Sequence, residues 1–135
     1  MSALSFRPEA RIVQINIPEV VAEVTAALAR YEQALMTNDV VVLNELFWVS
    51  PHTIRYGPAE LLYGHDEISR YRGARPAAGI ARTVERQVVT TFGRDAATAS
   101  VQFTRNGRIG RQMQTWIRMP EGWRVVAAHV SMLAT

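Results

Sequence analysis

The chain has 135 residues, of which 48% are hydrophobic, so it is long enough to form one domain with its own core. All fifteen basic residues are arginine, which excludes mechanisms that need a lysine, and the absence of cysteine excludes a thiol nucleophile and disulfides. The formal net charge of +3 invites a nucleic-acid function, but the arginines are scattered and form no recognisable binding motif.

The order of the chain predicts a short arm followed by one domain. Residues 1–15 are expected to form a loosely tied N-terminal arm, and residues 16–135 a single domain without repeats. The arm has no basic stretch leading into an apolar run, as a signal peptide would. No apolar run approaches the ~20 residues that cross a membrane. We therefore expect a cytoplasmic protein with no membrane or nucleic-acid partner.

Three helices are predicted in the first half of the domain. The first begins around Asn16, where Asn or the next residue would be the cap and a proline lies in the first turn. Asn38 and Asp39 can end this helix and cap the next, which is predicted over 40–48. A short strand over 53–56 precedes a third helix over 64–75. The first helix carries apolar residues at helical spacing, namely Val20, Val24, Ala27, Tyr31 and Ala34.

After residue 82 the spacing of the apolar residues changes from the three to four residues of a helix to the alternation of apolar and polar residues typical of strands. Asn-Gly between two strands is the strongest of the hairpin signals in this part. Helices followed by a meander of antiparallel strands predict an α+β fold, in which the N-terminal helices pack in a strongly bent, cone-shaped sheet. The wide end of the cone is the expected place for a ligand pocket. The strands are predicted over 83–92, 96–105, 110–119 and 123–133.

Three polar residues are candidates to line that pocket. Tyr31 lies on the apolar stripe of the first helix, and its buried hydroxyl needs a partner. Arg55 lies in the short strand, and a buried arginine is costly unless it meets an anion. His129 lies on a strand that is mostly apolar on both faces and shares a predicted face with Trp123 and Val125. The ordinary alternatives are a core tyrosine, a surface arginine on an edge strand and a hydrogen-bonded core histidine.

Further arginines and amides are weaker candidates. Arg72 and Arg75 end the third helix, where cations complement the helix dipole. Arg111 begins a strand on which two glutamines share a face with a tryptophan, and that face is either a pocket lining or a polar outer surface. The residues of this face are Gln112, Gln114 and Trp116.

Several common sites are missing from the sequence. There is no glycine-rich phosphate loop and no nucleophile elbow. The three histidines, at 52, 65 and 129, are spread along the chain. We therefore expect neither a cofactor nor a metal site.

Several segments together resemble the AtzH-like family, over about residues 18–133. The more distinctive are Arg30-Tyr31-Glu32 and Thr53-Ile54-Arg55-Tyr56-Gly57, and the others include Gly64-His65-Asp66-Glu67-Ile68, Gly110-Arg111-Gln112 and Gly122-Trp123-Arg124-Val125-Val126-Ala127-Ala128-His129. The sequence departs from what is expected of the family at Tyr71, where a phenylalanine is expected, and in a more basic hairpin around Asn106.

The resemblance implies a cystatin-like fold of the SnoaL-like, nuclear transport factor superfamily, usually a homodimer formed through the sheet. It also implies an activity, because the founding member is a decarboxylating amidohydrolase that acts on dicarboxyurea, and relatives accompany amidases. The family's proposed catalytic tyrosine and arginine fall on Tyr31 and Arg55.

These residues suggest a hypothesis for a small anionic substrate such as a carboxylated urea. Arg55 pairs with one carboxylate, and Arg72 or Arg111 holds the other. Gln114 or His129 bonds the urea oxygen, with Trp116 beside it. Tyr31 passes a proton between water and the leaving nitrogen.

Two other functions remain open. One is a non-catalytic dimeric small-ligand-binding protein or an accessory protein of an amidase, because this fold hosts such roles. A pocket filled by Met113 or Phe103 would favour it. The other is an isomerase, which needs a carboxylate base on the sheet wall, where the acids of the strands are confined to the neighbourhood of Glu85.

Overall fold

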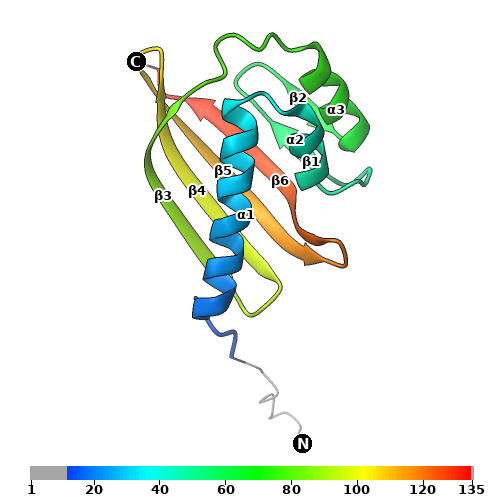
Figure 1. Ribbon diagram of the computed structural model, residues 1–135, viewed down its shortest axis with the longest axis vertical. Coiled ribbons are helices and arrows are strands. Elements are labelled where there is room, and N and C mark those ends of the chain that lie inside the picture. The colour runs from blue at the N-terminus through cyan, green and yellow to red at the C-terminus, as the bar shows by residue number, and fades with distance from the viewer. Residues whose placement is uncertain (1–11, 135) are drawn as a thin grey trace, which may run out of the picture.

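The computed structural model describes residues 12–134 and contains three helices and six strands in these residues (Figure 1). The helices are α1 (Pro18–Met36), α2 (Val40–Leu46) and α3 (His65–Ala74). The strands are β1 (Ile54–Tyr56), β2 (Leu61–Tyr63), β3 (Thr83–Phe92), β4 (Ala96–Arg105), β5 (Arg108–Met119) and β6 (Gly122–Met132). They form one sheet in the order β2-β1-β6-β5-β4-β3, in which β1 runs parallel to β6 and the other neighbours are antiparallel.

The arrangement confirms the predicted α+β fold. α1 crosses one face of the curved sheet, and α2 and α3 lie over its β1–β2 end (Figure 1). The apolar stripe of α1 is buried against the inner face of the sheet, where Phe103 and Trp116 are fully buried. The stripe has the spacing expected of an amphipathic helix and consists of Val20, Val24, Leu28, Tyr31, Ala34 and Leu35.

The two ends of α1 are built differently. Ile17 occupies the cap position without a side-chain bond, so the cap is the residue after Asn16, the second of the two predicted alternatives. Asn16 instead has a left-handed φ of 59°, and its Oδ1 accepts a hydrogen bond from the backbone nitrogen of Thr91 on β3. At the other end, Asn38 has a φ of 52° and Asp39 Oδ1 accepts from Val42 N, which confirms the predicted helix break and cap.

The predicted N-terminal arm is only partly described. Residues 1–11 lie outside the described residues. Further along, Gly93 N donates to Gln14 O at 2.8 Å, and Ile15 forms a bridge with Phe92. This end of the predicted arm therefore pairs with the outer strand β3.

The strand meander was predicted almost to the residue, but two features were not. β2 pairs with β1 and was missed, because Leu61–Tyr63 is too short to show alternation. β6 contains a bulge, since Val125 pairs with Trp116 and Ala127 pairs with Thr115, which leaves Val126 as an extra residue. The bulge reverses which face each later residue of β6 occupies.

Candidate functional site

A cavity of about 230 Å³ lies between α1, α3, the β1–β2 turn and the inner face of the sheet. Tyr31 and Leu35 of α1 contribute one wall, and Gln112 of β5 lies on the sheet side. Phe103 stays in the core beside the cavity and Met113 is exposed on the opposite face of the sheet, so neither residue fills it. The charged residues of the lining are mostly arginine, namely Arg55, Arg75, Arg82 and Arg105.

The structure brings Tyr31 and Arg55 into this one cavity. Tyr31 is 3% exposed, and its ring packs on Phe47 with centroids 6.3 Å apart. Arg55 faces inward from β1 and lies on the same side as buried Thr53, the shared face that the two-residue alternation predicted. Its guanidinium lies 5.4 Å from the centre of the Tyr71 ring, a cation–π contact that fixes its orientation.

Arg55 has a carboxylate partner that the sequence analysis did not identify. Its Nη1 donates to Glu60 Oε2 at 2.6 Å, and both side chains are largely buried. Glu60 belongs to the turn between β1 and β2, which is closed by a hydrogen bond from Gly57 N to Glu60 O. The only signal for this pair was the tight Gly57–Glu60 turn directly after the strand that carries Arg55.

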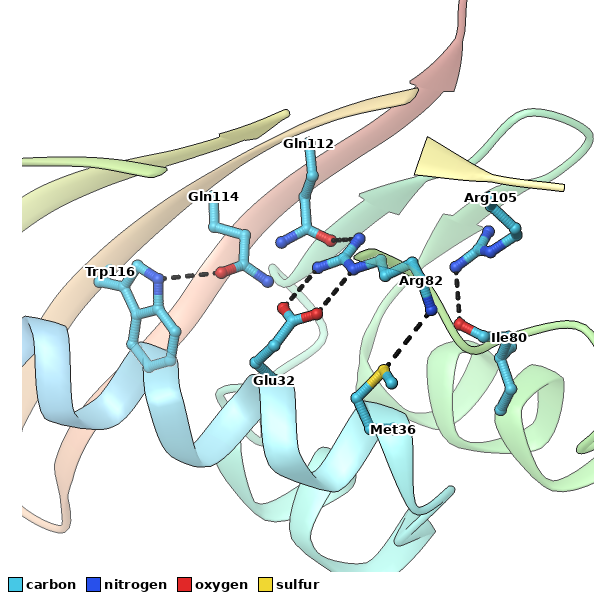
Figure 2. A network of polar contacts seen from close by, with 8 residues as sticks. All are labelled: Glu32, Met36, Ile80, Arg82, Arg105, Gln112, Gln114 and Trp116. Atoms are coloured by element: carbon cyan, nitrogen blue, oxygen red, sulfur yellow. Dashed lines mark hydrogen bonds and ion pairs between the residues drawn. The ribbon is translucent and has the colours of Figure 1, made fainter. Parts of the chain in front are cut away.

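A second arginine is neutralised by a carboxylate from α1 (Figure 2). Arg82 donates from Nε and Nη2 to the two oxygens of Glu32, at 2.9 and 2.8 Å, in a forked ion pair. Its Nη1 donates to Gln112 Oε1 at 3.2 Å, and its guanidinium lies 4.4 Å from the centre of the Phe103 ring. Arg82 is therefore fixed on all sides and contributes little unbalanced charge.

The other two guanidiniums of the cavity have no carboxylate partner among the described residues. Arg105 donates from Nη2 to Ile80 O at 2.9 Å (Figure 2). Burial lowers the pKa of Arg105, and the charges of Arg82 and Arg75 lower that pKa further. Buried donors without a partner remain on Arg75 (Nε and Nη2), Arg105 (Nε) and Gln112 (Nε2). Such a set of donors and unbalanced positive charge suits an anion with several oxygens.

Three of the expected binding residues are buried but do not line the cavity. Arg72 is 2% exposed, lies 4.1 Å from the centre of the Phe47 ring and donates to Asn44 Oδ1. Burial lowers the pKa of Arg72 to about 10, an effect that attraction to Tyr31 opposes. Arg72 therefore packs behind the cavity, against the Phe47 ring that contacts Tyr31. Trp116 donates from Nε1 to Gln114 Oε1 in the core beneath α1 (Figure 2).

The expectation that Arg111 and His129 line the pocket is corrected by the structure. Both are exposed on the opposite face of the sheet, where Arg111 Nε donates to Ser131 Oγ and His129 packs edge-on against Tyr56. His129 was misplaced because the bulge at Val126 reverses the alternation of β6. Arg111 was misplaced because it alternates with the inward-facing glutamines of β5.

Other features bear on the remaining possibilities. Glu85 is exposed at an irregularity of β3 and accepts a hydrogen bond from Thr104, so it offers no base to the cavity. Within residues 12–134, no group of three or more His, Asp or Glu side chains is arranged to hold a metal ion. In the same residues, no helix has the length and apolar character needed to span a membrane.

Comparisons with known proteins agree with this architecture. The profile of the AtzH-like family matches residues 13–135. A solved protein of unknown function from Pectobacterium atrosepticum, of the DUF3225 family, is 57% identical with a TM-score of 0.87, over 89% of this chain and 95% of that one. A cystatin-like fold protein from Burkholderia xenovorans is 46% identical with a TM-score of 0.86, over 91% and 98% of the two chains.

A third solved structure is more distant. It is a nuclear transport factor 2 (NTF2-like) superfamily protein from Salmonella enterica, 28% identical with a TM-score of 0.71, over 87% of this chain and 93% of that one. No curated protein matches the chain. The fold is thus the cystatin-like, NTF2-like fold.

Proposed function

This chain belongs to the AtzH-like family, and from that premise we propose that it is a small-molecule amidohydrolase acting on a carboxylated urea or a related small anionic amide. The observation that carries the proposal is the cavity in which Tyr31 meets Arg75 and Arg105, two arginines without a carboxylate partner in the part of the chain that the structure describes. A substrate with one or two carboxylates would supply the missing negative charge. The cavity volume of about 230 Å³ suits a ligand of this size.

The proposed chemistry is hydrolysis of a C–N bond. Arg75 and Arg105 bind the carboxylate oxygens and hold the carbonyl carbon near Tyr31. Water adds to that carbon, the C–N bond breaks, and Tyr31 passes a proton from water to the leaving nitrogen. Where the product is a carbamate, it then loses carbon dioxide. Arg55 stabilises the negative charge that develops on the carbonyl oxygen.

The test is turnover by purified protein, with release of ammonia and carbon dioxide as the readout. We expect hydrolysis of at least one of dicarboxyurea, allophanate and oxalurate. Tyr31→Phe should lower kcat by roughly 10²- to 10⁴-fold, the usual contribution of a positioned acid–base group. Tyr71→Phe is the matched control, because it removes a hydroxyl from the same cavity and should retain turnover. Full activity of Tyr31→Phe would refute the role of Tyr31.

A non-catalytic role as a small-ligand-binding or amidase-accessory protein is the second candidate. The observation that favours it is the apolar face of the sheet opposite α1, where Val88 and Met113 are 42% and 58% exposed. A folded protein that binds small dianions but hydrolyses none of the three compounds would support this role. The link to an amidase and the cytoplasmic location stay predictions.

We further propose that this face joins two copies of the chain into a homodimer. A groove beside Met113 is lined by Tyr56, Ala127 and His129, and burying such a surface would stabilise the pair. Light scattering should give the mass of two chains for the wild type and of one chain for Met113→Asp. Val41→Asp, on the exposed side of α2, should remain a dimer. A monomeric wild type would contradict the proposal.

A further inference from the structure

Glu60 is the one carboxylate among the described residues that line the cavity. Its Oε2 accepts from Arg55 Nη1 at 2.6 Å and its Oε1 accepts from the backbone nitrogen of Ala59 at 3.2 Å. The side chain is only 13% exposed. The carboxylate is therefore held in a defined position at the cavity wall, beside the residues assigned above to catalysis.

The backbone of the turn makes room for this carboxylate. A Cβ atom on Gly57 would overlap Oε2 and Cδ of Glu60, so the end of this flexible side chain would have to move. Gly57 is not in the left-handed region, so its conformation does not require glycine. The missing side chain of Gly57 leaves the space that the Glu60 carboxylate occupies when it binds Arg55.

The hydrogen-bonding character of Glu60 is opposite to that of its neighbours. The unpartnered groups of Arg75, Arg105 and Gln112 are all donors, which match the oxygens of a carboxylate. A carboxylate offers about four acceptor positions, of which Arg55 and Ala59 use two. A ligand made only of carboxylates would be repelled by Glu60 and would leave its remaining acceptor positions empty. A ligand that also has an N–H group would match them.

We propose that Glu60 is a specificity-determining residue, which accepts a hydrogen bond from an N–H group of the ligand and so selects anionic amides and ureas over anions without an N–H. The inference rests on the anion-binding cavity proposed above but not on hydrolysis. Sites built to hydrogen-bond a polar group reject analogues that lack it, because the protein group is then left unpaired.

The test compares two dianions whose heavy atoms are connected in the same way and differ in identity at one position. N-oxalylglycine has an amide N–H where 2-oxoglutarate has a methylene group. Titration calorimetry of the wild type should show at least ~10-fold tighter binding of N-oxalylglycine, since an unmatched buried polar group is costly. In Glu60→Gln the ratio should fall to within about twofold, because the amide of Gln bonds Arg55 through its oxygen and presents a donor to the ligand.

Two further variants separate the position of the carboxylate from the charge of residue 60. Gly57→Ala keeps Glu60 but pushes its carboxylate away from Arg55, so it should also lose the preference for N-oxalylglycine. Glu67→Gln removes the same charge from a carboxylate that lies outside the cavity and accepts a hydrogen bond from Tyr63 N. This variant should therefore keep the preference for N-oxalylglycine.

Equal affinity of the wild type for both dianions, binding of neither, or an unchanged ratio in Glu60→Gln would overturn the proposal. Hydrolysis is followed separately, as glycine release from N-oxalylglycine and as turnover of the carboxylated ureas. A wild type that prefers N-oxalylglycine but hydrolyses no amide would refute the amidohydrolase and leave the role of Glu60 intact.

Discussion

Replacing Arg75 with glutamine is expected to weaken binding of N-oxalylglycine by roughly 30-fold or more, without lowering the thermal stability of the protein. Removing one partner of a buried hydrogen-bonded charge pair costs about 2–5 kcal/mol of binding free energy, and each 1.4 kcal/mol is tenfold. Arg75 Nε and Nη2 are buried without a hydrogen-bond partner among residues 12–134, so a bound carboxylate would provide their first hydrogen bonds.

The expected effect on stability has the opposite sign. Among the described residues, Arg75 is a cation without a carboxylate partner, and its charge lowers the pKa of Arg105, after the larger effect of burial. Removing this charge relieves repulsion within the cavity, so the unfolding temperature should stay equal or rise.

Calorimetry and thermal unfolding together check this prediction. Arg70→Gln is the matched control, because Arg70 is an exposed arginine of α3, the helix that ends at the residue before Arg75, and it does not line the cavity. It should leave both quantities unchanged. Normal dianion binding by Arg75→Gln would contradict the assignment of Arg75 to the anion site.

The sequence was sufficient for features that depend on near neighbours. The apolar stripe of α1 predicted that Tyr31 is buried, because residues three or four apart lie on the same side of a helix. The alternation of the short strand predicted that Arg55 and Thr53 share a face, and the structure shows that this face is the buried one. The Asn106-Gly107 turn was predicted because both residues must take positive φ, and they have values of 52° and 75°.

The alternation of β5 predicted which of its residues share a face, but not which face is buried. Gln112, Gln114 and Trp116 were known to share a face, and that face turned out to be the inner one. Arg111 could then only point outward. The alternation of β4 likewise continues inward from Phe103 to Arg105, which lines the cavity. The sequence alone did not say which face was buried.

Other parts of the site depend on contacts that no periodicity encodes. Glu32 and Arg82 are 50 residues apart and meet only because α1 and the residue preceding β3 lie over the same part of the sheet. The bulge in β6 depends on the pairing with β5. Because of its one extra residue, His129 lies on the face opposite to the one that simple alternation predicted.

Glu32→Ala is expected to lower the free energy of unfolding by about 3–5 kcal/mol, because it leaves a buried guanidinium without its counter-ion. The side chain of Arg82 is 1% exposed and that of Glu32 is 19% exposed, so water has little access to the forked contact. Urea unfolding of the wild type and the variant measures the difference. Arg30→Ala is the control, since it breaks the exposed Arg30–Glu45 pair and should cost only about 0–1 kcal/mol.

The same substitution should also change ligand binding, in the direction opposite to Arg75→Gln. Without Glu32, Arg82 becomes a third cavity arginine without a carboxylate partner, so N-oxalylglycine should bind more tightly to the folded variant. The added ligand should then restore much of the lost stability, because binding to the native state alone favours folding by mass action. Weaker binding by folded Glu32→Ala would mean that the Arg82–Glu32 pair shapes the cavity more than it balances its charge.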